Sequence, residues 1–448
     1  MRYFLISLGC AKNTVDAEGM GQLLDNAHHQ PVDSPEKADL LIVNTCGFIE
    51  PARDESIGVL RELAETKQPG QWLIAAGCLS QRYGQVLAEQ VPGLDGILGT
   101  RRWMEIIALV NQLRQGHRGP LRDIPREGVI TPEPPGVMRA AVQGSNAYLK
   151  IADGCRRPCA FCAIPLIKGK ARSRPPESII AEARRLVDSG VREIILIAQD
   201  TTDYGRDLGL RDGLASLIDD IIAASPELHW LRIMYAYPGA ESITPRLIET
   251  MATHPQVCHY LDLPLQHSHP DVLKRMRRPS NMIRVQHQLD ALQTAMPDLA
   301  LRTAFIVGFP GETEAEFAEL EIFMSEMAFD KVGIFTYSHE EGTASAALPD
   351  DIPPEVKQER YERLMALQQN ISLARNQQQV GQVMDVLLEG SGDGLSLGRT
   401  YRDAPEVDGL VIIEEELPVG EIIQAKIINA MEYDLIAVPE PGSKEDNS

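Results

Sequence analysis

The stretch AYLKIADGCRRPCAFC, residues 147–162, decides the fold prediction for the centre of the chain. Its apolar start predicts a buried strand, and three cysteines follow: Cys155, Cys159 and Cys162. A structural zinc site closes with four ligands, and disulfides use cysteines in pairs. Three thiolates on one loop suit an iron–sulfur cluster with one open coordination position. A zinc knuckle or a chance grouping is the alternative.

Strand and helix patterns alternate after this loop. Candidate strands lie at 192–200, 229–237, 259–266, 300–309 and 330–338, and candidate helices near 177–189, 213–224, 245–254, 282–296 and 314–327. With the first strand they make six strand–helix units, fewer than the eight of a closed (βα) barrel. Residues 141–379 are therefore predicted to form a partial (βα)6 barrel, open on one side to a bulky substrate. Barrel chemistry lies at the carboxyl ends of the strands, where the cysteine loop is expected.

Three earlier cysteines each end a short apolar run: FLISLGC (4–10), LLIVNTC (40–46) and WLIAAGC (72–78). Helical patterns follow the runs, so residues 1–116 are predicted to form a parallel α/β domain. Ligands gather outside the carboxyl ends of such strands, so Cys10, Cys46 and Cys78 are expected to meet at one rim. Three small buried core cysteines are the alternative. The seventh cysteine, Cys258, is expected to be structural.

The remaining segments have simpler patterns. Residues 117–140 are rich in proline and are predicted to be a linker. A helical pattern runs from 353 to about 379, and short alternating strands with glycine-rich turns predict a small antiparallel β-barrel over 380–448. The fold class expected is therefore a multidomain α/β chain with a C-terminal β-barrel.

The charge and the apolar content of the chain limit which classes of partner and which location are expected. The 448 residues include 43 basic and 64 acidic side chains, a net charge of −21, which favours a basic partner over a nucleic acid. The sequence contains no run of about 18 apolar residues, so no membrane span is expected. The apolar run at the N-terminus is too short for a secretory signal. A cytoplasmic location is expected, where cysteine clusters bind metal more often than they form disulfides.

The cysteine spacing C-x3-C-x2-C, with the aromatic Phe161 before the last cysteine, resembles the radical S-adenosylmethionine signature. From the first strand to about residue 438, the chain resembles the methylthiotransferases, which combine a three-cysteine N-terminal domain, a radical barrel and a TRAM barrel. The resemblance is carried by SLGCAKNTVDAE, VNTCGFIEPA, AAGCLSQRY, DGCRRPCAFCAIPLIKGKARSRP, LPLQHSH, KRMRRP and FIVGFPGETEAEF.

This resemblance implies two 4Fe-4S clusters, one held by Cys10, Cys46 and Cys78 and one by Cys155, Cys159 and Cys162. The second cluster is expected to bind the amino and carboxylate groups of S-adenosylmethionine and to split its sulfonium with one electron. The first is expected to carry or activate the inserted sulfur. A second S-adenosylmethionine supplies the methyl group. An electron donor and a sulfur donor are implied as partners.

Other candidate site residues are weaker. Phe161, Gln199, Gln266 and Gly308 are expected near S-adenosylmethionine, with Gly308 allowing close backbone approach; loop residues without cofactor contact are the alternative. His267 and His269 are interpreted as solvated loop histidines rather than metal ligands. The basic run after the cysteine loop is expected either to hold the cofactor carboxylate or to cover the rim; it comprises Lys168, Lys170, Arg172 and Arg174.

One branch of the resembled family modifies a tRNA adenosine, and another modifies an aspartate β-carbon in a small-subunit ribosomal protein. Residues 381–448 carry 4 basic and 15 acidic residues, a surface expected to repel RNA, although it could also be only a solvated barrel. GRTYRDAPEVDG and MYAYPG resemble the protein-modifying branch. We therefore expect Asp403, Glu406 and Asp408 to dock a basic ribosomal protein, free or in the assembling subunit. A tRNA methylthiotransferase and a non-catalytic iron–sulfur scaffold are the rival hypotheses.

Overall fold

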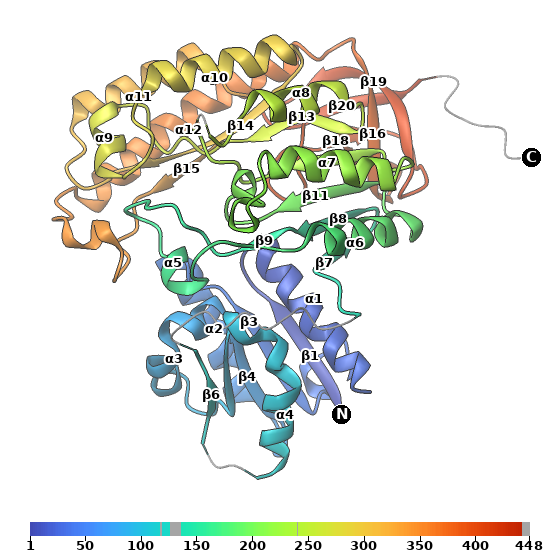
Figure 1. Ribbon diagram of the computed structural model, residues 1–448, viewed down its shortest axis with the longest axis vertical. Helices are drawn as coiled ribbons and strands as arrows, with labels where there is room; N and C mark the ends of the chain where they lie inside the picture. The colour runs from blue at the N-terminus through green and yellow to red at the C-terminus, as the bar shows by residue number, and fades with distance from the viewer. Residues whose placement is uncertain (117–118, 126–135, 240, 441–448) are drawn as a thin grey trace, which may run out of the picture.

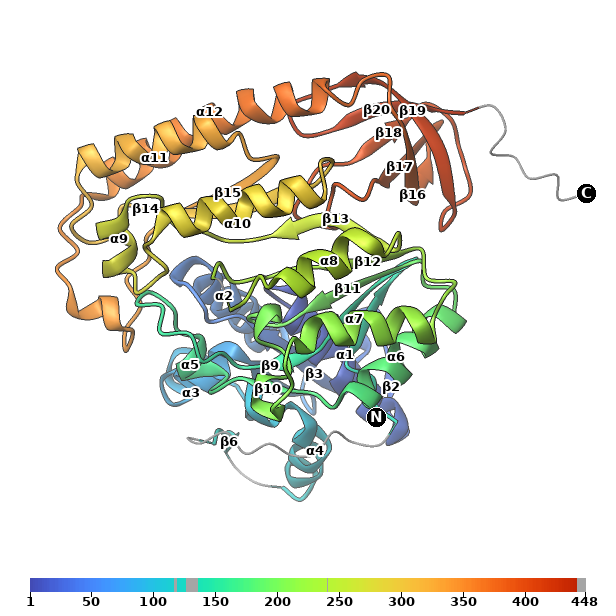
Figure 2. The same cartoon turned by 45° about the horizontal axis from the view of Figure 1, so that its top comes forward.

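The computed structural model describes residues 1–116, 119–125, 136–239 and 241–440. Figure 1 shows an N-terminal domain in blue, a central barrel in green to orange and a small β-barrel in red. The second view, in Figure 2, places the red barrel at the far end of the central barrel from the blue domain. No helix in the described ranges is long and apolar enough to cross a bilayer.

The N-terminal domain is built on a six-stranded parallel sheet in the order β2-β1-β3-β4-β5-β6. Successive side chains of a strand point to opposite faces, so Leu40 and Ile42 pack under α1 and α4, while Leu41 and Val43 pack under α2 and α3. The elements are β1 (Arg2–Ser7), α1 (Ala11–Asn26), β2 (Gln30–Pro31), β3 (Leu40–Thr45), α2 (Glu50–Thr66), β4 (Trp72–Gly77), α3 (Cys78–Gln90), β5 (Gly96–Gly99), α4 (Ile106–Arg114) and β6 (Leu121–Asp123). Strand β6 lies inside the predicted linker 117–140 and pairs with β5.

The central domain is a seven-stranded sheet in the order β15-β14-β13-β12-β11-β8-β7, in which β7 is the antiparallel edge strand. The strands β15 and β7 do not pair, so the predicted partial barrel is confirmed. The strands are β7 (Ala140–Gln143), β8 (Asn146–Lys150), β11 (Glu193–Ile197), β12 (Trp230–Ile233), β13 (Val257–Asp262), β14 (Ala300–Val307) and β15 (Lys331–Thr336). A short pair, β9 (Ala152–Asp153) and β10 (Arg172–Ser173), flanks the cysteine loop and α5 (Ile164–Ile167).

Amphipathic helices cover this sheet. They are α6 (Pro176–Asp188), α7 (Gly213–Ala224), α8 (Pro245–Thr253), α9 (Pro270–Arg275), α10 (Met282–Ala295) and α11 (Glu314–Met327). Helix α11 shows why the sequence folds this way. Thr313 and Glu316 form a capping box at its start, and Phe317, Leu320 and Met324 share one face that is buried in the core.

Helix α12 (Pro354–Gln377) leads to the C-terminal domain, a closed barrel in the order β16-β17-β18-β20-β19. Its strands are β16 (Val383–Gly392), β17 (Leu395–Arg399), β18 (Val411–Ile413), β19 (Ile422–Ala430) and β20 (Leu435–Pro439). The predicted β-barrel is therefore confirmed. Its small interior is filled by aliphatic side chains such as Val386, Val411 and Ala425.

Buried ion pairs join this small barrel to the central one. Glu193 at the start of β11 accepts hydrogen bonds from both Arg232 and Arg399, each at 2.6 Å, and all three side chains are at most 1% exposed. Arg402 pairs with Asp330 in the same way. Breaking such a pair is expensive because it leaves one charge buried without compensation.

The predicted docking residues Asp403 and Asp408 belong to this interface. Asp403 pairs with Lys331 at 2.6 Å, and Asp408 pairs with Arg302 at 3.3 Å while accepting a bond from Tyr260. Their side chains are 5% and 2% exposed, so the structure contradicts the docking role of these two acids. Their charges are neutralised by barrel residues that the charge count could not identify.

Replacing Asp403 with Asn should lower the free energy of unfolding by about 3–5 kcal/mol, because the Lys331 ammonium then lacks its counter-charge. Asp393→Asn, the same change at an exposed hairpin position, is the control and should shift the urea midpoint little. A D403N protein of normal stability that binds its substrate protein poorly would restore the docking hypothesis.

Candidate active site

The first three cysteines meet at the carboxyl ends of neighbouring strands. Cys10 caps α1, Cys46 follows β3, and Cys78 opens α3. Gly9, with φ of 96°, lies so close to Cys46 that a Cβ there would stand 3.1 Å from the Sγ atom, so the approach requires glycine. The three cysteines therefore lie at the ends of adjacent strands, on one rim of the sheet, and their binding of one cluster stays a prediction.

Asn13 organises this rim. Its side-chain Nδ2 donates to the carbonyls of Leu8 and Thr45, and its Oδ1 accepts from the Cys78 thiol at 3.3 Å. Asn13 itself is buried, and all of its polar side-chain atoms are thereby used. One amide side chain thus ties the turn after β1, the end of β3 and the start of α3.

The pKa values of the three thiols of the first triad are shifted in different directions. Cys10 is solvent-accessible but densely surrounded; burial opposes its ionisation, yet the Lys12 ammonium and the backbone N–H groups of Asn13 and Lys12 hold its pKa below the ordinary value. Burial raises the pKa of Cys46 and raises that of Cys78 to about 12. Since only the thiolate binds metal, loading this rim with a metal cluster releases protons.

The second cysteine loop is fixed by backbone hydrogen bonds at both ends. Cys155 donates its N–H to Gly169, and Ala160 donates to Met276. Gly154, with φ of 72°, has the Lys170 carbonyl only 2.2 Å from where a Cβ would stand, so a larger residue would open the loop. Phe161 packs against a cluster that includes Phe309, which anchors the loop to the carboxyl ends of β13–β15.

Both arginines and carboxylates lie beside the second triad. Burial raises the pKa of Cys155 to about 11 and that of Cys162 to about 12. Arg278 reaches the Cys159 Sγ at 3.7 Å. The guanidinium groups of Arg278 and Arg157 both lie over the Tyr237 ring, 4.3 and 4.0 Å from its centroid. Because Arg157 is already paired with Asp200 at 2.6 Å, Arg278 is the one of these two arginines that can meet an anionic group at the loop.

The two triads are neighbours. Cys78 of the first packs in a small buried cluster with Ala163 and Ile167, which directly follow Cys162 of the second. Arg101 reinforces the contact by donating to the carbonyls of Ile167 and Leu166, at 2.8 and 2.9 Å. The rim of the first domain therefore faces the reactive end of the barrel.

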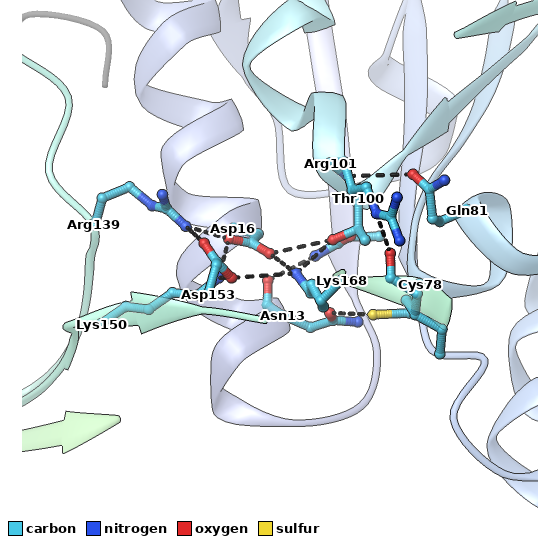
Figure 3. A network of polar contacts seen from close by, with 12 residues as sticks. Asn13, Asp16, Cys78, Gln81, Thr100, Arg101, Arg139, Lys150, Asp153 and Lys168 are labelled. Carbon is cyan, nitrogen blue, oxygen red and sulfur yellow. Dashed lines mark hydrogen bonds and ion pairs between the residues drawn. The ribbon is translucent and has the colours of Figure 1, made fainter. Parts of the chain in front are cut away.

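A buried ion network holds this arrangement (Figure 3). Asp16 on α1, 1% exposed, accepts bonds from Lys150 at 2.7 Å, Lys168 at 2.6 Å and Arg139 at 2.8 Å. Burial alone would raise the pKa of Asp16, but Lys150 and Lys168 hold it below its ordinary value. Asp153 shares the same three cations. One domain thus contributes a carboxylate that the other domain's cations enclose.

The donor set fits iron–sulfur clusters better than a single ion. Within the described ranges, no three His, Cys, Asp or Glu side chains converge closely enough to bind one metal ion. The cysteines of a four-iron cluster bind different irons, so they surround a volume rather than a point. Burial raises the pKa of Cys78 and of Cys162, and the other two thiols of each triad add to that rise.

The predicted cofactor contacts have mixed outcomes. Gln199, after β11, has a buried Oε1 atom without a hydrogen-bond partner, and Gln266, after β13, has a left-handed φ of 79°. Both features are common at ligand sites. The space beside Gly308 is filled by the Lys357 side chain, 2.4 Å from where a Cβ would stand, so close packing accounts for that glycine.

Other polar residues also differ from expectation. His267 is fully buried rather than solvated, and desolvation lowers its pKa to about 3. His269 caps α9, accepting from the N–H of Asp271. Lys168 and Arg174 of the basic run are bound to Asp16 and Glu182, while Lys170 and Arg172 are exposed.

Sequence reasoning assigned no role to Lys12, Asp16, Tyr235, Tyr237 or Arg278. All five lie inside the motif stretches SLGCAKNTVDAE, MYAYPG and KRMRRP. The motif stretches therefore contained these residues, but only the fold shows which of them lie near the cysteines.

Comparison with known families assigns a class to this architecture. Residues 149–324 match the radical SAM superfamily, residues 380–439 match the TRAM domain, and residues 2–99 match the uncharacterised protein family UPF0004. The chain is thus a radical S-adenosylmethionine protein with a C-terminal TRAM domain, a class that uses an iron–sulfur cluster and S-adenosylmethionine.

Curated relatives identify the family within that class. The chain is 49% identical to the ribosomal protein uS12 methylthiotransferase RimO of Chloroflexus aurantiacus, covering 97% of this chain and 99% of the relative. It is 46% identical to the protein of that name from Roseiflexus sp., covering 100% of both. The chain belongs to the RimO family of radical methylthiotransferases.

Solved structures support the fold. The radical S-adenosylmethionine methyltransferase TsrM from Kitasatospora setae superposes with a TM-score of 0.55 at 14% identity, covering 91% of this chain and 82% of that one. The cobalamin-dependent radical enzyme OxsB gives 0.51 at 12% identity, covering 82% and 56%. At such identities the likeness concerns architecture alone.

Replacing Asp16 with Asn should reduce thiomethyl transfer about 10²-fold, because small misplacements of reacting groups cost about that much. Iron content should stay normal, since no cysteine is altered. Asp33→Asn, an exposed acid of the same domain paired with Lys37, is the control. Normal transfer by D16N would show that the network does not position the two triads.

Proposed function

We propose that the chain transfers a thiomethyl group to the β-carbon of an aspartate in ribosomal protein uS12. Its curated relatives are named for this substrate protein. The structural observation that carries the proposal is the contact of Cys78 with Ala163 and Ile167, which sets two cysteine triads side by side. A radical enzyme that only cleaved S-adenosylmethionine would need one triad, whereas a second beside it suits sulfur insertion.

In this proposal each triad holds a four-iron cluster. Cys155, Cys159 and Cys162 would hold the cluster that, when bound with S-adenosylmethionine, would supply the radical chemistry for removing a hydrogen atom from the aspartate. Overall, one C–H bond of the aspartate is replaced by a C–S bond. The hydrogen would leave in 5′-deoxyadenosine, formed together with methionine from one S-adenosylmethionine. The methyl group would come from a second one, which becomes S-adenosylhomocysteine. A sulfur donor would supply sulfide-level sulfur, and the one electron that an electron donor supplies for cleavage would be returned when the C–S bond forms.

The chain's own residues bind and orient. Gln199 and Gln266 are the proposed contacts of S-adenosylmethionine, Gln199 because its buried Oε1 atom lacks a partner. Phe161 holds the cysteine loop on the barrel. Of the predicted docking acids, Glu406 is exposed, although its carboxylate also accepts a bond from Gln143 at 2.8 Å. It stays a proposed contact for a basic partner, either free uS12 or the assembling small subunit.

The test uses protein reconstituted anaerobically with iron and sulfide. It is incubated with reductant, S-adenosylmethionine and purified uS12, and the product is analysed by mass spectrometry. We expect a gain of one thiomethyl group on one aspartate, and none on tRNA offered in parallel. Modification of tRNA instead would favour the rival tRNA methylthiotransferase.

Cysteine replacement separates the two proposed clusters. The Ala variant of Cys155, Cys159 and Cys162 should keep one cluster and lose cleavage of S-adenosylmethionine. The Ala variant of Cys10, Cys46 and Cys78 should keep the other cluster and cleavage but transfer no thiomethyl group. Iron analysis and product quantification check both, and normal transfer by the second variant would refute the division of roles.

A further inference from the structure

Lys12 is a buried lysine that forms no ion pair with a carboxylate in the described part of the chain, although the Cys10 thiolate lies near it. Its side chain is 8% exposed, and within the described ranges its ammonium makes neither a hydrogen bond nor an ion pair. Its contact is with the Tyr235 ring, whose centroid lies 2.8 Å from Nζ. Burying a charge is costly unless it is paired, and a ring face compensates only part of that cost.

The charges near Lys12 have both signs: the Cys10 thiolate and Asp262 favour its charged form, and Lys150 and Lys168 oppose it. Lys150 and Lys168, also buried, are both paired with Asp16. Asp262 is near the ammonium, but its Oδ1 accepts from Arg302 at 2.9 Å and its Oδ2 from the Tyr235 N–H at 3.1 Å. Within the described ranges the Lys12 ammonium therefore keeps N–H donors without an acceptor, and an anion can fill these positions.

Lys12 also lies between the two cysteine triads. It follows Cys10 by two residues on α1, and Tyr235 follows the end of β12. Two residues further on, the Tyr237 ring is covered by Arg278, which contacts Cys159. The short segment from Tyr235 to Tyr237 thus runs from one triad to the other.

The backbone of this segment is constrained. Tyr235 has a φ of 64°, a left-handed conformation that is strained for a bulky residue. Its carbonyl accepts from Thr201 and its N–H donates to Asp262, so the surrounding strands hold it there. Backbone strain that the surrounding structure maintains is typical of ligand sites. Here the strained residue is the one whose ring contacts the Lys12 ammonium.

We infer that Lys12 binds the carboxylate of the substrate residue that receives the thiomethyl group, with the Tyr235 ring holding the ammonium in place. The inference rests on the proposed function. A β-carbon that must reach both triads lies one bond from its own carboxylate, so a cation between the triads can orient it. An adenosine base carries no carboxylate, so the same contact favours a protein over RNA.

The test compares uS12 with its variant in which the modified aspartate is Asn. Wild-type enzyme should prefer the Asp substrate by about 10²-fold in kcat/KM, the loss typical of removing one partner of a buried charge pair. Lys12→Met, similar in length but uncharged, should lose most of that preference. Lys12→Arg should recover part of it, because the positive charge returns.

Lys37→Met makes the same change at an exposed lysine of the same domain and should keep the full preference. Iron content and the electron paramagnetic resonance spectra of the reduced clusters are recorded for each variant. An Asp preference unchanged in K12M would overturn the inference, as would a wild-type enzyme that accepts Asn equally well. Loss of first-triad iron in K12M would assign Lys12 to the cluster instead. If the wild type modifies no aspartate of uS12, the proposed function fails first and the inference with it.

Discussion

The rest of the structure depends on one buried carboxylate. Asp16 lies on the first helix of the N-terminal domain, and the three cations around it, Arg139, Lys150 and Lys168, come from the segments that begin the barrel and close its cysteine loop. None of these buried groups is stable without the others, because an unpaired charge in the interior is costly. The ion network can therefore form in one relative orientation of the two domains, and that orientation puts Cys78 against the second cysteine loop.

Buried ion pairs also join the central barrel to the TRAM domain. Glu193 between Arg232 and Arg399, together with the pair of Asp403 and Lys331, buries charges from both domains. Part of the acidic excess of the last domain is thus used to fix its position rather than to attract a partner. Net charge describes long-range attraction, but it does not distinguish an exposed carboxylate from one neutralised by a neighbouring domain.

The sequence could predict features that depend on local patterns, but not which charged residues another domain would bury. Strand and helix periodicity carries the order of elements, because side chains of a strand or helix report burial locally. The grouping of the first three cysteines was predictable since parallel strands bring their carboxyl ends together, and that of the second three since they lie on one loop. The roles of Asp403 and His267 were not, because burial depends on which distant segment covers a residue. Asp16, whose partners lie 123 to 152 positions away, could not be predicted for the same reason.

Thiomethyl transfer also requires groups from two domains to lie close together. A thiomethyl transfer brings a radical source, a sulfur source and one substrate carbon into a single place, although the two cysteine triads come from different domains. The segment from Tyr235 to Tyr237 lies between them, with Lys12 over one ring and Arg157 and Arg278 over the other. Arg157 is paired with Asp200, so Lys12 at one end and Arg278 at the other are the cations that suit two anionic groups, the carboxylate of S-adenosylmethionine and that of an aspartate. A site built in this way selects its substrate by charge at the reacting residue itself.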